Sequence, residues 1–143
     1  MGKLQVKYDK LQRALATFCE AVESLNEAHQ KHSSHKLILS LQDSLIKRFE
    51  YSIDGSWKYI KYYLEIELKS PPEYSSPKPI IRKACLAGLV SEEESSIFLD
   101  MFEKRNLTSH MYQEELAGIV IKNAQQYYDT MKKCIDRIPP LSE

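Results

Sequence analysis

The residues best suited to chemistry lie in one short stretch, from Glu103 to Tyr112, before the final helical segment. Arg105 could neutralise a phosphate, and His110 could give or take a proton near neutral pH. Asn106 could orient the histidine or the phosphate by hydrogen bonding. The same side-chain types also occur in buried polar networks that cap two helices. Residue types alone therefore leave a reactive site and a structural network as open alternatives.

The spacing of these residues constrains how they could act together. On one continuous helix, Asn106 and His110 would point about 40° apart, whereas Arg105 and His110 would point about 140° apart. A joint action of Arg105 and His110 thus requires a bend at this junction or the help of neighbouring helices.

Two long apolar stripes precede this stretch. From Leu4 to Leu25 apolar residues recur at alternating spacings of four and three, which predicts one amphipathic helix up to about His32. A second stripe from Leu41 to Leu64 predicts another helix, with Ser34 as its N-cap. The second stripe keeps its phase across Gly55, so we expect an unbroken helix there, despite a cost of about 1 kcal/mol for a glycine inside a helix.

The middle of the chain is interrupted by prolines. The segment from Ser70 to Pro79 contains four of the six prolines, which predicts a loop. A short helix is expected from Ile80 to Ala87, with Gly88 at the C′ position that closes it.

The remaining chain predicts two further helices. Ser91 and Glu94 have the spacing of a capping box, so a helix should begin after Ser91 and run toward Arg105. A last helix is expected from Gln113 to Ile135. With no strand-like alternation and no internal repeat, the prediction is an all-α, up-and-down bundle of four long helices plus one short helix, spanning residues 1–143 as a single domain.

Composition excludes several classes of protein. The 143 residues carry 20 Lys and Arg and 20 Asp and Glu, so the net charge is +0 and broad, salt-driven capture of nucleic acid is not expected. No apolar run approaches the roughly 18 residues of a membrane helix, and the N-terminus does not resemble a signal peptide. We therefore expect a cytoplasmic protein with no membrane contact.

Neither a cofactor nor a metal is expected. The four glycines are scattered, so there is no glycine-rich phosphate loop, and no Asp-x-Asp pair suggests a two-metal nucleotidyltransferase site. His29, His32 and His35 fall in a polar segment that we interpret as a solvated turn. The three cysteines are predicted to be buried free thiols.

The junction also carries a family resemblance. The pattern Arg105-Asn106-x3-His110-x-Tyr112 resembles the Arg-x4-His-x-Tyr signature of HEPN domains, in the version paired with minimal nucleotidyltransferases. Segments within 49–65 and 81–90 also resemble the nucleotidyltransferase substrate binding family of that group. The resemblance extends from about the second predicted helix through the last.

This resemblance implies a helical homodimer that works with a separate, cognate minimal nucleotidyltransferase. In many HEPN proteins, residues matching Arg105 and His110 form a metal-independent ribonuclease site, with Asn106 as a further candidate catalytic residue here. Lys104 and Arg105 are then candidates for binding phosphate. In pairs that act as toxin and antitoxin, the nucleotidyltransferase silences its partner by adenylylating the tyrosine that Tyr112 matches.

The ribonuclease hypothesis has a chemical requirement of its own. RNA cleavage without metal needs a base, an acid and a cation for the developing charge, and one chain offers one well-placed histidine. A symmetric dimer would bring two copies of Arg105 and His110 together. Two functions follow: an endoribonuclease toxin-type subunit acting on RNA, or a non-catalytic module that binds a nucleotide or other substrate for the nucleotidyltransferase. In neither case is the chain itself a nucleotidyltransferase.

Overall fold

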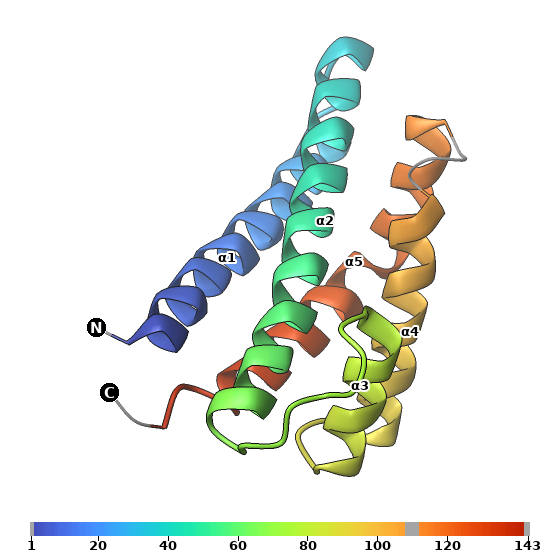
Figure 1. The fold of residues 1–143 in the computed structure, drawn as a ribbon. Helices are drawn as coiled ribbons and strands as arrows, with labels where there is room; N and C mark the ends of the chain where they lie inside the picture. The colour runs from blue at the N-terminus through green and yellow to red at the C-terminus, as the bar shows by residue number, and fades with distance from the viewer. Residues whose placement is uncertain (1, 108–111, 142–143) are drawn as a thin grey trace.

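Two long helices, α1 (Lys3–Gln30) and α2 (His35–Ile66), run antiparallel and form one side of the molecule (Figure 1). The computed structural model describes residues 2–107 and 112–141. The helix α5 (Gln113–Asp136) packs against both α1 and α2 and completes the main bundle. The short helix α3 (Pro77–Leu86) and α4 (Glu92–Asn106) cover the other side of α2.

The stripes seen in the sequence form the core. Leu11, Leu15 and Phe18 of α1 are buried, as are Phe49 and Ile60 of α2. The Phe18 and Phe49 rings lie 6.0 Å apart, centroid to centroid. Burial of such side chains is worth about 1.5–3 kcal/mol each, which explains why the two helices pack against each other.

Gly55 lies inside an unbroken α2, as predicted. A Cβ atom at this position would sit 3.1 Å from Cδ1 of Leu11, so the missing side chain lets α1 approach α2 closely. The helix therefore tolerates the cost of glycine because a neighbouring helix occupies the space.

Ser34 caps α2 as expected: its side chain accepts a hydrogen bond from the backbone N–H of Leu37. At the start of α4, Ser91 and Glu94 form the predicted capping box. Gly88 adopts a φ of 80° just after α3, which fits the predicted C′ role, because a left-handed backbone favours glycine.

The proline-rich segment differs from its prediction at one end. We expected a loop as far as Pro79, but α3 begins at Pro77. The first N–H groups of a helix have no acceptor within it, so prolines are tolerated in the first turn. The first backbone hydrogen bond of α3 is donated by the N–H of Ile80 to the carbonyl of Ser76. Neither Pro77 nor Pro79, which lack an N–H, is therefore needed as a donor.

Over residues 2–107 and 112–141 the architecture confirms an all-α bundle of four long helices and one short helix, with α5 ending one residue later than expected. All three cysteines are free thiols. Only Cys134 is buried, whereas Cys19 and Cys85 are partly exposed, so the prediction of burial was wrong for those two. Within the described part of the chain, none of the helices combines the length and the apolar character needed to span a membrane.

Candidate functional site

The helix α4 carries Arg105 in its last turn and fixes where it lies. The capping box sets the start of α4, and the buried side chains of Phe98, Met101 and Phe102 anchor it against the core. These anchors hold the rotation of the helix, so the direction in which Arg105 leaves α4 is determined by packing.

Arg105 is held between two carboxylates of α2. Its Nη1 atom lies 2.6 Å from Oε2 of Glu50, and its Nη2 atom lies 3.2 Å from Oδ2 of Asp54. Nε also donates a hydrogen bond to Asp54 at 3.3 Å. Glu50 and Asp54 are one helical turn apart, so α2 presents them together to the guanidinium.

The electrostatics of this cluster keep Arg105 charged. Partial burial lowers its pKa, but the hydrogen bonds and charge of Asp54, together with the charge of Glu50, outweigh that effect and raise the pKa overall. All three side chains remain partly exposed, with 33% for Arg105, 25% for Glu50 and 36% for Asp54. The cluster is thus a partly exposed network in which two carboxylates fix one guanidinium, and not a sealed core network.

Lys104 takes part in a different network. Its Nζ atom lies 2.7 Å from Oδ1 of Asp100, and the hydroxyl of Tyr127 donates to the other oxygen of the same carboxylate. Burial raises the pKa of Asp100, but these two hydrogen bonds and the charge of Lys104 lower it overall. Lys104 is 20% exposed, so phosphate would have to draw it away from Asp100.

The other predicted site residues occupy the end of α4 and the start of α5. Asn106 is exposed in the last turn of α4. Tyr112 is the N-cap residue of α5, makes no capping hydrogen bond through its side chain, and is 81% exposed. His110 lies outside the described residues, within 108–111.

A pocket of about 540 Å³ opens beside Arg105. Arg105 and Asn106 line it from α4, and Trp57 lines it from α2. The start of α3 closes it with Ser76, Pro77, Lys78 and Pro79. The proline-rich segment, which the sequence suggested only as a connection, therefore forms one wall of the candidate site.

Charge in this pocket is mostly positive. Among its lining residues, Lys58, Lys78 and Arg105 are cationic, and Asp54 is the only carboxylate that the described residues contribute to the lining. Lysine and arginine near an apolar, aromatic wall suit a ligand with a phosphate and a flat ring. No group of three or more histidine, cysteine, aspartate or glutamate residues that could hold a metal occurs in the part of the chain described.

The sequence pattern indicated Arg105 and Asn106 but did not indicate the partners of Arg105 on α2. Glu50 and Asp54 are four residues apart on one face of a helix, which is a detectable signal. Nothing in the spacing, however, indicates that Arg105 is the cation they face.

Comparison with protein families identifies the chain. The family described as nucleotidyltransferase substrate binding protein like matches residues 8–139. The chain belongs to this family. No curated protein matches the sequence.

Solved structures similar to this member of the nucleotidyltransferase substrate binding family share its helical fold. A protein from Thermus thermophilus is 30% identical, with a TM-score of 0.65, over 85% of this chain and 98% of that one. A tri-AMPylated HEPN toxin of Shewanella oneidensis, solved in complex with an MNT antitoxin, is 19% identical, with a TM-score of 0.66, over 95% of this chain and 96% of that one. A mutant of the toxin-antitoxin MntA-HpeT is 20% identical, with a TM-score of 0.66, over 90% and 95% of the two chains.

Proposed function

We propose that this chain is the helical partner of a cognate minimal nucleotidyltransferase in a toxin–antitoxin pair, and that it carries a metal-independent endoribonuclease site. The observation that carries the proposal is Arg105, clamped by Glu50 and Asp54 at the edge of an open, cationic pocket. This arginine begins the Arg-x4-His-x-Tyr pattern, and the family match and the toxin complexes of similar fold support the pairing.

In this proposal the site is completed by a second copy of the chain. One His110 takes the proton of a ribose 2′-OH as its oxygen attacks the adjacent phosphorus. The other His110 gives a proton to the departing 5′-oxygen, so the products are a 2′,3′-cyclic phosphate and a 5′-hydroxyl. The two Arg105 guanidiniums stabilise the negative charge that builds on the phosphate oxygens.

The neighbours of Arg105 have distinct roles in this scheme. Glu50 and Asp54 are positioning residues, since they touch the guanidinium and fix its direction. Asn106 orients the histidine or the phosphate from the exposed end of α4. Lys104 is a secondary phosphate ligand that becomes available when it leaves Asp100.

Tyr112 is the proposed site of silencing. The phenolic oxygen attacks the α-phosphorus of ATP, the new O–P bond links AMP to the tyrosine, pyrophosphate leaves, and the phenolic proton passes to a base of the nucleotidyltransferase. The exposed position of Tyr112 gives the enzyme access to the hydroxyl. The tri-AMPylated state of the Shewanella toxin supports this proposal.

Ribonuclease activity is tested by purifying the chain and incubating it with labelled single-stranded RNA in the presence of EDTA. We expect cleavage to 2′,3′-cyclic phosphate ends that is lost in His110→Ala and Arg105→Ala. Cleavage that continues at an unchanged rate in His110→Ala would exclude the proposed site. Size-exclusion chromatography with light scattering should give the mass of a dimer.

Silencing is tested by adding the cognate nucleotidyltransferase and ATP, followed by mass spectrometry of peptides. AMP should appear on the peptide that contains Tyr112 and be absent in Tyr112→Phe. Tyr74 is 61% exposed and serves as an internal control that should stay unmodified. Modification of Tyr74 to the same extent would show that exposure alone selects the tyrosine.

A second function is favoured by the composition of the pocket itself. Trp57 beside Lys58, Lys78 and Arg105 could hold a nucleotide for the partner without any cleavage. In that case the wild-type chain would leave RNA intact, and Trp57→Ala would weaken ATP binding measured by calorimetry. Under the ribonuclease proposal, ATP binding to the isolated chain should be weak and independent of Trp57.

A further inference from the structure

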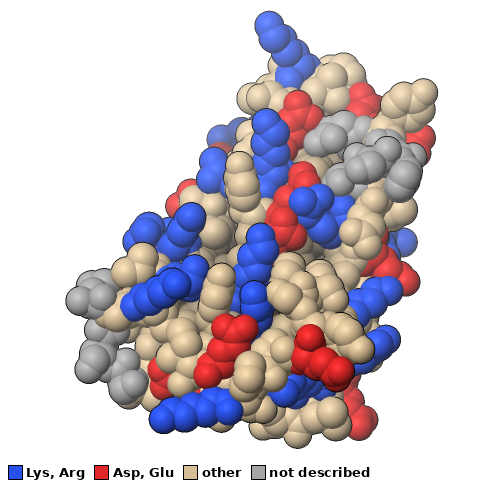
Figure 2. Space-filling view, viewed as in Figure 1, with Lys and Arg blue, Asp and Glu red and all other residues tan. Residues whose placement is uncertain are grey.

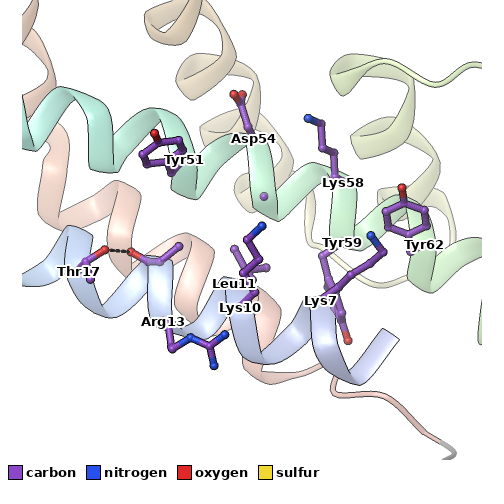
Figure 3. A pocket seen from close by; sticks show the side chains of 12 residues that line it. Lys7, Lys10, Leu11, Arg13, Thr17, Tyr51, Asp54, Lys58, Tyr59 and Tyr62 are labelled. Atoms are coloured by element: carbon purple, nitrogen blue, oxygen red, sulfur yellow. Dashed lines mark hydrogen bonds between the residues drawn. The ribbon is translucent and has the colours of Figure 1, made fainter. Parts of the chain in front are cut away.

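A second and larger hollow, of about 810 Å³, lies between the first half of α1 and the second half of α2. Leu11, Ala14 and Gly55 form its floor, where the missing side chain of Gly55 lets the helices approach. Figure 3 shows Lys7 and Lys10 of α1 pointing toward α2, with Tyr51 and Lys58 on the α2 side. We call this feature the α1–α2 groove.

The groove concentrates positive charge on a chain of zero net charge. Its lining contains Lys7, Lys10, Arg13 and Lys58. None of these four cations forms an ion pair with a carboxylate of the described residues. Figure 2 shows Lys and Arg side chains gathered on the α1 side of this face. Cations without local carboxylates favour an anionic ligand.

Asp54 is the only carboxylate found among the lining residues described, and it faces the other way. Its oxygens bind the guanidinium of Arg105 at the α4 side of α2. In Figure 3 its carboxylate points away from α1, so it does not face the amino groups of Lys7 and Lys10.

Aromatic rings accompany the cations. Tyr51 is 69% exposed and lines the groove together with these cations, so its ring is open to a ligand there. The Nζ of Lys7 lies 4.2 Å from the ring centroid of Tyr62. Exposed rings beside cations match single-stranded nucleic acid, whose bases stack on aromatic faces while its phosphates bind lysine and arginine.

The groove continues into the candidate site. Asp54 and Lys58 line both the α1–α2 groove and the smaller pocket beside Arg105. An extended chain seated in the groove would therefore pass Lys58 and reach Arg105. A mononucleotide could fill only one of these two hollows, whereas a strand could occupy both.

We infer that the α1–α2 groove binds the single-stranded RNA that flanks the scissile phosphate. Lys7, Lys10, Arg13 and Lys58 bind its phosphates, and Tyr51 stacks on a base. This inference rests on the proposed ribonuclease function for the identity of the ligand. The groove residues can nevertheless be replaced without changing His110 or Tyr112, so the two proposals can be tested separately.

The test measures binding of a fluorescein-labelled decauridylate by anisotropy, with His110→Ala as the background so that the probe stays intact. Lys7→Ala with Lys10→Ala should weaken binding at least tenfold, and both lysines line the groove but not the pocket beside Arg105. Because each phosphate contact to a single strand contributes about 0.7 to the slope of log affinity against log salt, the slope should fall by about 1.4. Lys36→Ala with Lys122→Ala is the matched control: it removes the same charge from exposed positions outside the groove and should bind as the background does.

Stacking is tested at Tyr51. Tyr51→Ala should weaken binding on the order of tenfold, with an unchanged salt slope, whereas Tyr51→Phe keeps the ring and should bind normally. Circular dichroism of every variant establishes that the helices are intact, since the changed side chains are at the surface.

Different experimental results would contradict RNA binding in the groove and the ribonuclease proposal. Groove variants that bind the probe as tightly as the control pair would overturn the inference while leaving cleavage by His110 untouched. Normal RNA binding with lost binding of the nucleotidyltransferase would also overturn it and assign the groove to an acidic surface of that partner. Groove-dependent RNA binding by a chain that never cleaves RNA would uphold the groove as a binding site for single-stranded RNA and reject the ribonuclease.

Discussion

The carboxylate of Glu50 lies 2.6 Å from the guanidinium of Arg105, so helix α2 holds the residue that α4 presents to the pocket. Such an ion pair at a partly exposed position adds little to stability, with a typical value of about 0–1 kcal/mol. Its larger effect is on the orientation of Arg105, because Glu50 and Asp54 together restrict the rotation of this long side chain. The pair is therefore better explained as a positioning device than as a stabilising one.

Replacing Glu50 tests this role. Glu50→Ala should lower kcat for RNA cleavage about tenfold to a hundredfold with a small change in KM, because a misdirected guanidinium fails mainly at the transition state. Glu50→Gln keeps a hydrogen-bond acceptor and should lose less. The unfolding midpoint in urea should barely change.

Asp43→Ala is the matched control for Glu50. Asp43 is an exposed carboxylate on the same helix and forms no ion pair with the described residues. A loss of activity equal to that of Glu50→Ala would indicate a general effect of charge on α2 and would contradict the positioning role.

Two glycines inside helices should respond differently to replacement by alanine. At Gly118 of α5 a new Cβ would meet nothing within 4 Å, so Gly118→Ala should raise the free energy of unfolding by about 1 kcal/mol. At Gly55 the Cβ would lie 3.1 Å from the buried Leu11, and the strain should cancel that gain or reverse it. Urea denaturation measures both. Equal stabilisation at the two sites would show that α1 moves aside freely.

The parts of the fold that could be predicted from the sequence are those that depend on interactions between residues close together in the chain. The two long stripes, the cap at Ser34 and the capping box at Ser91 depend on residues within a few positions of one another, and all were predicted correctly. The start of α3 was misjudged because prolines interrupt a helix but also suit its first turn.

Only part of the candidate site could be predicted from the sequence. Arg105 and Asn106 belong to a local pattern, so sequence indicated them. The contacts of Arg105 with Glu50 and Asp54 join α4 to α2, and the walls of the pocket come from α2, α3 and α4 together. No spacing rule connects residues on separate helices, because the packing of whole helices decides which faces meet.

Acid should weaken the fold through Glu94. The hydrogen bonds from Arg137 are the largest cause that lowers its pKa, to about 2, and outweigh the opposing effect of burial. A carboxyl whose pKa is lower in the folded state than in the unfolded chain stabilises the fold at any pH above its unfolded pKa. This contribution is lost as the pH falls through about 4.5 toward 2. The loss should be about 1–2 kcal/mol, because the partly exposed Arg137 is screened by solvent.

Glu94→Gln should remove this dependence. Unfolding in urea at pH 7 and at pH 3 should show a smaller difference for Glu94→Gln than for the wild type. Glu93→Gln is the control, because Glu93 is exposed in the same first turn and has no ion pair among the residues described. An equal change in both variants would assign the effect to the first turn of α4 in general.

The three thiols should react at rates that follow their surroundings. Burial is the largest cause that raises the pKa of Cys134, to about 12, and the nearby Glu94 raises it further. A thiol reacts as its thiolate, so Cys134 should be inert to Ellman's reagent in the folded protein at pH 8. Cys19 and Cys85 are partly exposed and should react in the native state, with Cys134 following only in denaturant. Three native thiols reacting in one fast phase would mean that α5 opens readily, which the packing of Cys134 against the core does not allow.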